Sequence, residues 1–145
     1  MDFSLLNQDE VAINLSDFRG KKVIVFFYPK AFTPGCTKQN CELSENYDKL
    51  LDNGYVLIGI SPDKCEKLAK FKNDYNLNQI LLSDENKEVA KLFGAWGIKK
   101  NYGKEYEGLI RSCFVLDENG EIIKEYRNHK ATGFATRLMK DLLEK

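Results

Sequence analysis

The strongest constraint on the fold is a short apolar run that stops at a loop leading to a cysteine. Residues 23–27 (VIVFF) are dense in β-branched and aromatic side chains, the composition of a buried strand. The loop that follows contains Pro29, Pro34 and Gly35 and leads to Cys36, which begins a helical pattern. Unpaired N–H groups and the macrodipole at a helix N-terminus stabilise an anion. This stretch is therefore suited to hold a reactive thiolate.

Apolar runs and helical patterns alternate along the rest of the chain. The turn sequence at residues 117–120 (DENG) predicts an antiparallel hairpin near the end. Such an alternation predicts an α/β sandwich, with helices flanking a mixed central β-sheet. The length of 145 residues predicts one domain spanning residues 1–145. We expect helices over residues 36–53, 62–75, 86–93 and 132–144, and strands over residues 23–28, 55–60, 80–82, 112–116 and 121–126, while residues 1–20 and 95–109 carry no pattern that assigns them.

Charge and cysteine content restrict the function. Lys and Arg total 22, and Asp and Glu total 22, so no net field favours nucleic acid or an anionic membrane. The N-terminus has no signal-peptide pattern and no apolar run is long enough to span a membrane, so we expect a cytoplasmic protein with reduced thiols. The spacing C-x4-C is not that of a zinc site, and the single histidine, His129, lies far away in a polar stretch where we expect it to be solvated. We therefore expect no metal.

The two cysteines of the first helix are expected to have different surroundings. At about 100° per residue, Leu43, Tyr47 and Leu50 fall within roughly 40° of Cys36, and these apolar residues form the face expected to pack on the sheet. Cys41 falls about 140° away, toward solvent. The spacing therefore predicts a shielded Cys36 and a more exposed Cys41.

The same stretch resembles a known family. Pro29, Thr33 and Cys36 reproduce P-x-x-x-T-x-x-C, the active-site signature of peroxiredoxins, and FFYPKAFTPGCTKQNC is similar to the bacterioferritin-comigratory (PrxQ-type) subgroup. Residues 61–63 (SPD), 94–97 (GAWG) and 102–120 also resemble that subgroup, so the match spans nearly the whole chain. The resemblance implies a thioredoxin-like fold and a thiol peroxidase that needs no metal, haem or flavin cofactor.

The resemblance also implies a role for each matching residue. Cys36 would attack the peroxide and become a sulfenic acid, and Cys41 would resolve it as an intramolecular disulfide. Thioredoxin or a similar dithiol would then restore both thiols. Thr33 would hydrogen-bond the thiolate and the peroxide, although a threonine here can also simply cap the helix. Pro29 would shield the sulfur from water.

Arg111 is the remaining candidate site residue. An arginine is costly to bury without an anionic partner, and the resemblance makes that partner the Cys36 thiolate. The alternative is an ordinary surface arginine. Cys65 and Cys113 are interpreted as structural, because each lies on an apolar face of its element, although the subgroup usually has a small residue such as threonine where Cys113 stands.

Two other functions remain as alternatives. A thioredoxin-type disulfide oxidoreductase would carry C-x-x-C at the helix start, whereas this chain has C-x4-C. A redox sensor that passes its oxidation to a protein partner would use similar cysteine chemistry, so the sequence separates it poorly. We expect hydrogen peroxide and organic hydroperoxides as substrates. The subgroup contains monomers and weak dimers, and a monomer is our expectation.

Overall fold

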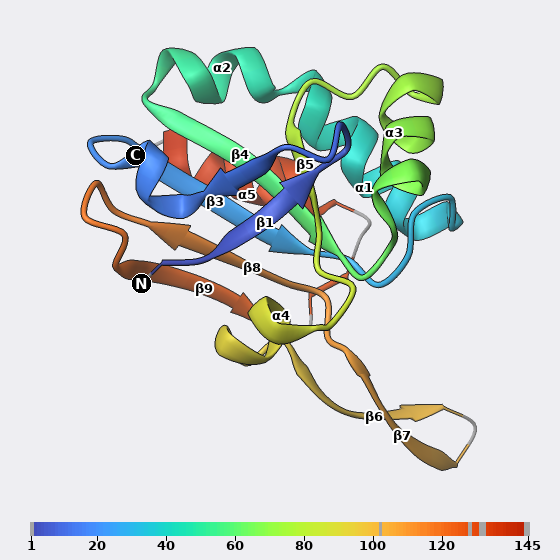
Figure 1. The fold of residues 1–145 in the computed structure, drawn as a ribbon. Coiled ribbons are helices and arrows are strands. Elements are labelled where there is room, and N and C mark those ends of the chain that lie inside the picture. The colour runs from blue at the N-terminus through green and yellow to red at the C-terminus, as the bar shows by residue number, and fades with distance from the viewer. Residues whose placement is uncertain (1, 102, 128, 131–132, 144–145) are drawn as a thin grey trace.

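Seven strands form one mixed sheet in the computed structural model, which describes residues 2–101, 103–127, 129–130 and 133–143 (Figure 1). Their order is β2-β1-β5-β4-β3-β8-β9, and a separate two-stranded sheet pairs β6 with β7. The strands are β1 (Ser4–Asn7), β2 (Ala12–Asn14), β3 (Lys22–Phe27), β4 (Tyr55–Ser61), β5 (Ile80–Ser83), β6 (Trp96–Asn101), β7 (Lys104–Leu109), β8 (Ser112–Leu116) and β9 (Ile122–Arg127). The helices are η1 (Leu15–Phe18), α1 (Pro34–Glu45), α2 (Tyr47–Asp52), α3 (Cys65–Asp74), α4 (Glu88–Leu92) and α5 (Phe134–Leu143).

The register of the central strand β3 determines which loops meet at one edge of the sheet. β3 runs parallel to β4 and antiparallel to β8, with Phe27 opposite Ile60 on one side and Ser112 on the other. Strand β3 therefore ends where β4 ends and where β8 begins. The loop before α1, the turn after β4 and the residue before β8 consequently lie close together, although they are far apart in sequence.

Each face of the sheet has its own buried apolar cluster. Alternate side chains of β3 point to opposite faces, so Ile24 and Phe26 join one cluster while Val25 and Phe27 join the other. The first cluster takes side chains from α1, α2, α3 and α5, and the second from η1 and α4. Because both faces are covered, every side chain from Val23 to Phe27 is buried. The predicted α/β sandwich around a mixed sheet is confirmed.

The single long helix predicted over residues 36–53 is instead two helices. Asn46 separates α1 from α2 with φ −99° and ψ 0°, and its side-chain amide donates to the carbonyl of Glu42 at 2.8 Å. Asn40 makes the same bond to the carbonyl of Cys36 inside the unbroken α1, so this bond accompanies the break and does not by itself cause it. Gly54 follows α2 with φ +84°, a left-handed conformation that favours glycine, as expected for the residue that ends the second helix.

Two regions left unassigned by the sequence contain strands. Residues 1–20 include β1 and β2, which extend the sheet beyond β5, and residues 95–109 contain the β6–β7 hairpin, which projects away from the main sheet (Figure 1). Helices α3 and α4 begin two to three residues later than predicted. The last helix runs over Phe134–Leu143, while its predicted ends at Thr132 and Glu144 lie outside the described residues.

Within the described part of the chain, every helix is too short or too polar to cross a lipid bilayer. The same residues contain no group of three or more His, Cys, Asp or Glu side chains placed to hold a metal ion.

Candidate active site

Cys36 lies in the first turn of α1. Thr33 occupies the N-cap, Pro34 the first helical position and Cys36 the third, so the backbone N–H of Cys36 belongs to the unpaired first turn. Proline suits the first position because its fixed φ matches the helix and it has no N–H to leave unpaired. The Cys36 side chain is fully buried against the sheet, as the helical spacing predicts. A sulfur at this position lies at the positive end of the helix macrodipole.

Arg111 contacts the sulfur of Cys36. It is half-buried, directly precedes β8, and its Nη2 donates to Cys36 Sγ at 3.0 Å. Its other terminal nitrogen, Nη1, donates to Oε1 of Gln39, which is fully buried in the next turn of α1. The arginine is therefore held by both ends of its fork, which is the geometry of an anion-binding residue rather than of a solvated surface arginine.

The hydroxyl group of Thr33 does not donate a hydrogen bond to Cys36. Its Oγ1 donates to the backbone carbonyl of Lys30 at 2.8 Å, and its own carbonyl accepts the first helical bond from Thr37. The side chain forms no capping bond, so the simple capping alternative does not hold either. With its proton committed to Lys30, the hydroxyl oxygen can still accept a hydrogen bond from a peroxide O–H.

Two adjacent residues fix the loop before α1 by different interactions. Ala31 donates its backbone N–H to Oδ2 of Asp63 at 2.7 Å, and the same oxygen accepts from Ser61 at 3.0 Å. Phe32 adopts φ +68°, an uncommon conformation for this side chain, while its ring packs edge-on against Phe71 at 5.1 Å between centroids. Asp63 and Phe32 together hold the backbone that leads into Thr33 and the first turn of α1.

The half-buried Pro29 belongs to the same loop, directly after β3. Proline removes a backbone donor and fixes φ, so it makes the start of this loop more rigid.

Cys41 lies five residues, or about one and a half turns, further along α1 and is half-buried, packed at the margin of the first apolar cluster. Its predicted difference from Cys36 is confirmed. Partial burial, followed by the carboxylates of Glu45 and Glu42, raises the pKa of the Cys41 thiol above its usual value. All four cysteines lie within the described residues, and each is a free thiol.

The segment between the two cysteines is more firmly held than its polar sequence suggests. Gln39 and Asn40 are both fully buried, and the Asn40 side chain donates to the carbonyl of Cys36 at 2.9 Å. From sequence alone, polar residues at these positions are expected to bury few apolar contacts, and the burial of both side chains contradicts that expectation. On the helical wheel Asn40 falls about 40° from Cys36, on the sheet-facing side, and that spacing could have identified it.

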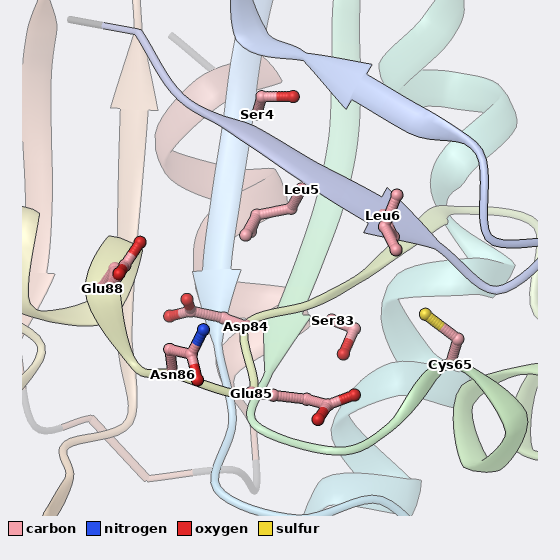
Figure 2. Close-up of a pocket in the computed structure, with 9 residues that line it drawn as sticks. All are labelled: Ser4, Leu5, Leu6, Cys65, Ser83, Asp84, Glu85, Asn86 and Glu88. Carbon is pink, nitrogen blue, oxygen red and sulfur yellow. The ribbon is translucent and has the colours of Figure 1, made fainter.

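Cys65 occupies a separate hollow. Figure 2 shows its thiol with Ser83 and Leu6 in a pocket formed by β1, the start of α3 and the segment between β5 and α4. None of the five candidate residues lines this hollow. Burial is the main cause of the raised pKa of the Cys65 thiol, which keeps it protonated and weakly nucleophilic. A structural role fits this environment.

Cys113 lies in the middle of the sheet, opposite Phe26 on β3 and Tyr126 on β9. It is fully buried, and burial raises the pKa of its thiol far above the usual range. A neutral thiol in a closed apolar site is inert, which agrees with the structural interpretation.

His129 was predicted to be solvated, and the structure contradicts this prediction. Its ring stacks on Phe134 at 3.8 Å between centroids, with an interplanar angle of 13°. Burial is the main cause of the lowered pKa of His129, and the charges of Arg111 and Arg137 lower it further. The histidine is therefore neutral and part of the packing beside Arg111.

These features define the class of the protein. A thioredoxin-like sheet presents a buried cysteine in the first turn of a helix, with an arginine on its sulfur and a second cysteine in the same helix. Such an arrangement belongs to a thiol-dependent oxidoreductase. The sequence profile described as the AhpC/TSA family matches residues 1–125, and the chain belongs to this family.

Individual relatives narrow the family to one subgroup. A putative peroxiredoxin of Mycobacterium tuberculosis is 48% identical over 140 residues, covering 97% of this chain and 89% of the relative. Peroxiredoxin Bcp of Escherichia coli is 47% identical over 130 residues, with 90% and 83% covered. Among solved structures, the Xanthomonas campestris bacterioferritin comigratory protein superposes with a TM-score of 0.91 at 25% identity, over 97% of this chain and 89% of that one.

The predicted resemblance to Bcp or PrxQ peroxiredoxins and the thioredoxin-like fold are thus confirmed. The chain is a peroxiredoxin, an enzyme that reduces peroxides by thiol chemistry. Membership implies a peroxide substrate and a thioredoxin-type reductant.

Proposed function

We propose that Cys36 is the residue that reduces the peroxide. Its thiolate attacks one peroxide oxygen, the O–O bond breaks, and Cys36 becomes a sulfenic acid while water or an alcohol leaves. The observation that carries the proposal is the 3.0 Å contact between Arg111 Nη2 and Cys36 Sγ in the first turn of α1. That arrangement provides positive charge for the thiolate and for the negative charge that moves onto the departing oxygen.

Arg111→Ala is expected to slow the reaction of Cys36 with peroxide about a hundredfold, the usual cost of removing one donor from a developing anion. Stopped-flow mixing of the reduced variant with one equivalent of hydrogen peroxide measures this step alone. Arg127→Ala is a matched control, because Arg127 is an exposed arginine one strand away that binds the carbonyls of Phe93 and Gly94. Equal rates for Arg111→Ala and the unaltered enzyme would remove Arg111 from the site.

In the second step of the proposal, the Cys41 thiol attacks the Cys36 sulfenic acid, and water leaves as the disulfide forms. An intact α1 does not permit this bond. Residues five apart in a regular helix have Cα atoms about 8.6 Å apart, pointing about 140° away from each other. A disulfide requires roughly 4.4–6.8 Å and converging side chains. The first turns of α1 must therefore unwind.

Unwinding of α1 costs free energy, because it breaks hydrogen bonds that are present in the structure. It breaks the bonds of Gln39 to Arg111 and of Asn40 to the Cys36 carbonyl. The neutral bond of Asn40 contributes about 0.5–1.5 kcal/mol, and the bond from the charged Arg111 about 1.5–3 kcal/mol. Leu43 and Leu50 are fully buried in the first apolar cluster and would stay in place. The proposal is therefore a local unwinding of residues 37–42, not a detachment of the helix.

A thioredoxin-type dithiol then attacks the disulfide and restores both thiols. Cys41 is the more exposed of the two sulfurs, which supports it as the point of attack. We propose hydrogen peroxide and organic hydroperoxides as substrates, since the Xanthomonas campestris bacterioferritin comigratory protein has alkyl peroxide reduction activity. We also propose that the protein is a monomer, since one chain carries both cysteines. We place it in the cytoplasm, where thiols are kept reduced.

The experiment that tests this function compares hydrogen exchange in the two redox states. One equivalent of peroxide is expected to give a Cys36–Cys41 disulfide by peptide mass mapping, and faster exchange at residues 37–42 than in the reduced protein. Exchange in α3 should stay unchanged and serves as the internal control. Disulfide formation with equal protection of residues 37–42 in both states would contradict the unwinding step. Peroxide consumption without thioredoxin-dependent turnover would instead favour the redox sensor.

A further inference from the structure

A buried glutamine outside the proposed site binds α1 between the two cysteines. Gln79 lies just before β5, and its side chain is fully buried. Its Nε2 donates to both oxygens of Asn40, to the backbone carbonyl at 3.2 Å and to Oδ1 at 3.0 Å. Asn40 in turn donates to the carbonyl of Cys36 at 2.9 Å. A chain of hydrogen bonds therefore runs from Gln79 to the backbone of Cys36.

The orientation of the Gln79 amide follows from its partners. A backbone carbonyl can only accept, so the NH₂ end of the amide must face Asn40. Among the described residues, Oε1 of Gln79 is buried without a hydrogen-bond partner. A buried amide with one unsatisfied end contributes less to overall stability than an apolar side chain of similar size could. The bonds to Asn40 are thus what this side chain specifically provides.

The backbone around Gln79 is held in place. Lys72 Nζ donates to the carbonyls of Leu77 at 2.8 Å and Gln79 at 2.6 Å, and Asn78 donates its N–H to Ser44 Oγ at 2.9 Å. The bonds to Leu77 and Gln79 do not involve α1. A donor fixed in this way loses little freedom when it binds, so its hydrogen bonds to Asn40 are effective.

Unwinding of residues 37–42 must break the Gln79–Asn40 bonds. We propose that Gln79 is a positioning residue that holds α1 in its helical, peroxide-reactive form and so sets how readily the Cys36–Cys41 disulfide forms. This inference rests on the proposed function. Stronger hydrogen bonding of Gln79 to α1 keeps the helix wound and the Cys36 sulfenic acid beside Arg111 for longer. A second peroxide molecule can then oxidise it to sulfinic acid. Weaker hydrogen bonding lets the helix unwind more readily, so Cys41 reaches Cys36 sooner.

Gln79→Met is the test, because methionine keeps the length and volume of the side chain and removes both donors. Loss of the two bonds is expected to increase the unwound population of the reduced protein on the order of tenfold. Hydrogen exchange at residues 37–42 of the reduced protein should rise by that factor. Disulfide formation after one equivalent of peroxide should accelerate, and the sulfinic acid fraction at excess peroxide should fall.

The reduction potential separates this role from general stabilisation. Gln79 binds Asn40 only while residues 37–42 are helical, so its loss destabilises the reduced form and not the disulfide form. A tenfold shift lowers the reduction potential of the Cys36–Cys41 couple by about 30 mV. Asn78→Ala is the matched control, since it alters the exposed neighbouring side chain, and it should move neither the potential nor the exchange.

Asn40→Ala tests the same pair from the other side if Gln79→Met does not fold, because it removes the Gln79 bond to Oδ1 and leaves the bond to the backbone carbonyl. The effect of the double variant should be smaller than the sum of the two single effects, since both variants remove the bond to Oδ1. Unchanged exchange and potential in these variants, with the disulfide still forming, would overturn the role of Gln79 alone. Failure of the unaltered protein to form the Cys36–Cys41 disulfide would overturn the proposed function itself.

Discussion

Cys36→Ser is expected to reduce peroxide turnover to the uncatalysed rate, a loss on the order of 10⁴-fold or more, as when the nucleophile of an enzyme is removed. A serine hydroxyl stays protonated where a thiol can ionise, and oxygen is a far weaker nucleophile toward a peroxide bond. Serine nearly matches the shape of cysteine, so α1 and its contact with Arg111 should persist. The measurement is a coupled assay with thioredoxin, thioredoxin reductase and NADPH over hydrogen peroxide and an organic hydroperoxide.

Replacement of the other buried cysteines provides the controls. Cys65→Ser should retain most of the activity, because Cys65 lies in a different hollow from the site (Figure 2). Cys113→Ser places a hydroxyl in a fully buried strand position and should cost about 1–3 kcal/mol of stability if that hydroxyl finds no partner. Cys113→Ala is therefore measured beside it. Wild-type turnover by Cys36→Ser would overturn the assignment of the nucleophile.

The placement of Cys36 could be predicted from sequence because local rules determine it. A buried strand followed by a proline-containing loop and a helical pattern leaves few positions for that side chain. The contact of Arg111 with Cys36 could be predicted only from the family resemblance. In the structure, the antiparallel pairing of β3 with β8 brings residue 111 to residue 36. Periodicity carries no information about such non-local pairing.

The predicted bounds of the first helix were wrong at Asn46, where the structure has two helices instead of one. Asn46 lies within an unbroken apolar periodicity, so the spacing of Leu43, Tyr47 and Leu50 predicts one helix, and all three are indeed buried. The break lies in the backbone of Asn46, with φ −99° and ψ 0°, and the periodicity of apolar side chains does not register such a local change.

The β6–β7 hairpin was missed for a different reason. It projects away from the main sheet, and most of β7 is exposed on both faces (Figure 1). A strand without a buried face leaves no alternation of polar and apolar residues to detect. The roles of Gln39 and Gln79 are similarly invisible, because polar residues are presumed exposed until their partners are known. Only the burial of Asn40 could be inferred, from its helical spacing of about 40° from Cys36.

Cys41→Ser is expected to separate the two steps of the cycle. The first reaction with peroxide should proceed within about twofold of the unaltered rate, because Cys41 lies outside the contact between Cys36 and Arg111. Steady-state turnover with thioredoxin should fall about a hundredfold. An intramolecular thiol acts at an effective concentration of about millimolar, whereas an external dithiol supplied at about 10 micromolar must reach a sulfenic acid that is buried.

The same variant should accumulate sulfinic acid at Cys36, since a sulfenic acid without a resolving thiol remains available to a second peroxide. Intact-protein mass after a tenfold excess of peroxide would show a gain of two oxygens in Cys41→Ser, against loss of two hydrogens in the unaltered protein. Cys65→Ser, treated identically, should form the Cys36–Cys41 disulfide as the unaltered protein does. Full thioredoxin-dependent turnover by Cys41→Ser would mean that the reductant reaches Cys36 directly, and unwinding of α1 would then serve access by the reductant rather than disulfide formation.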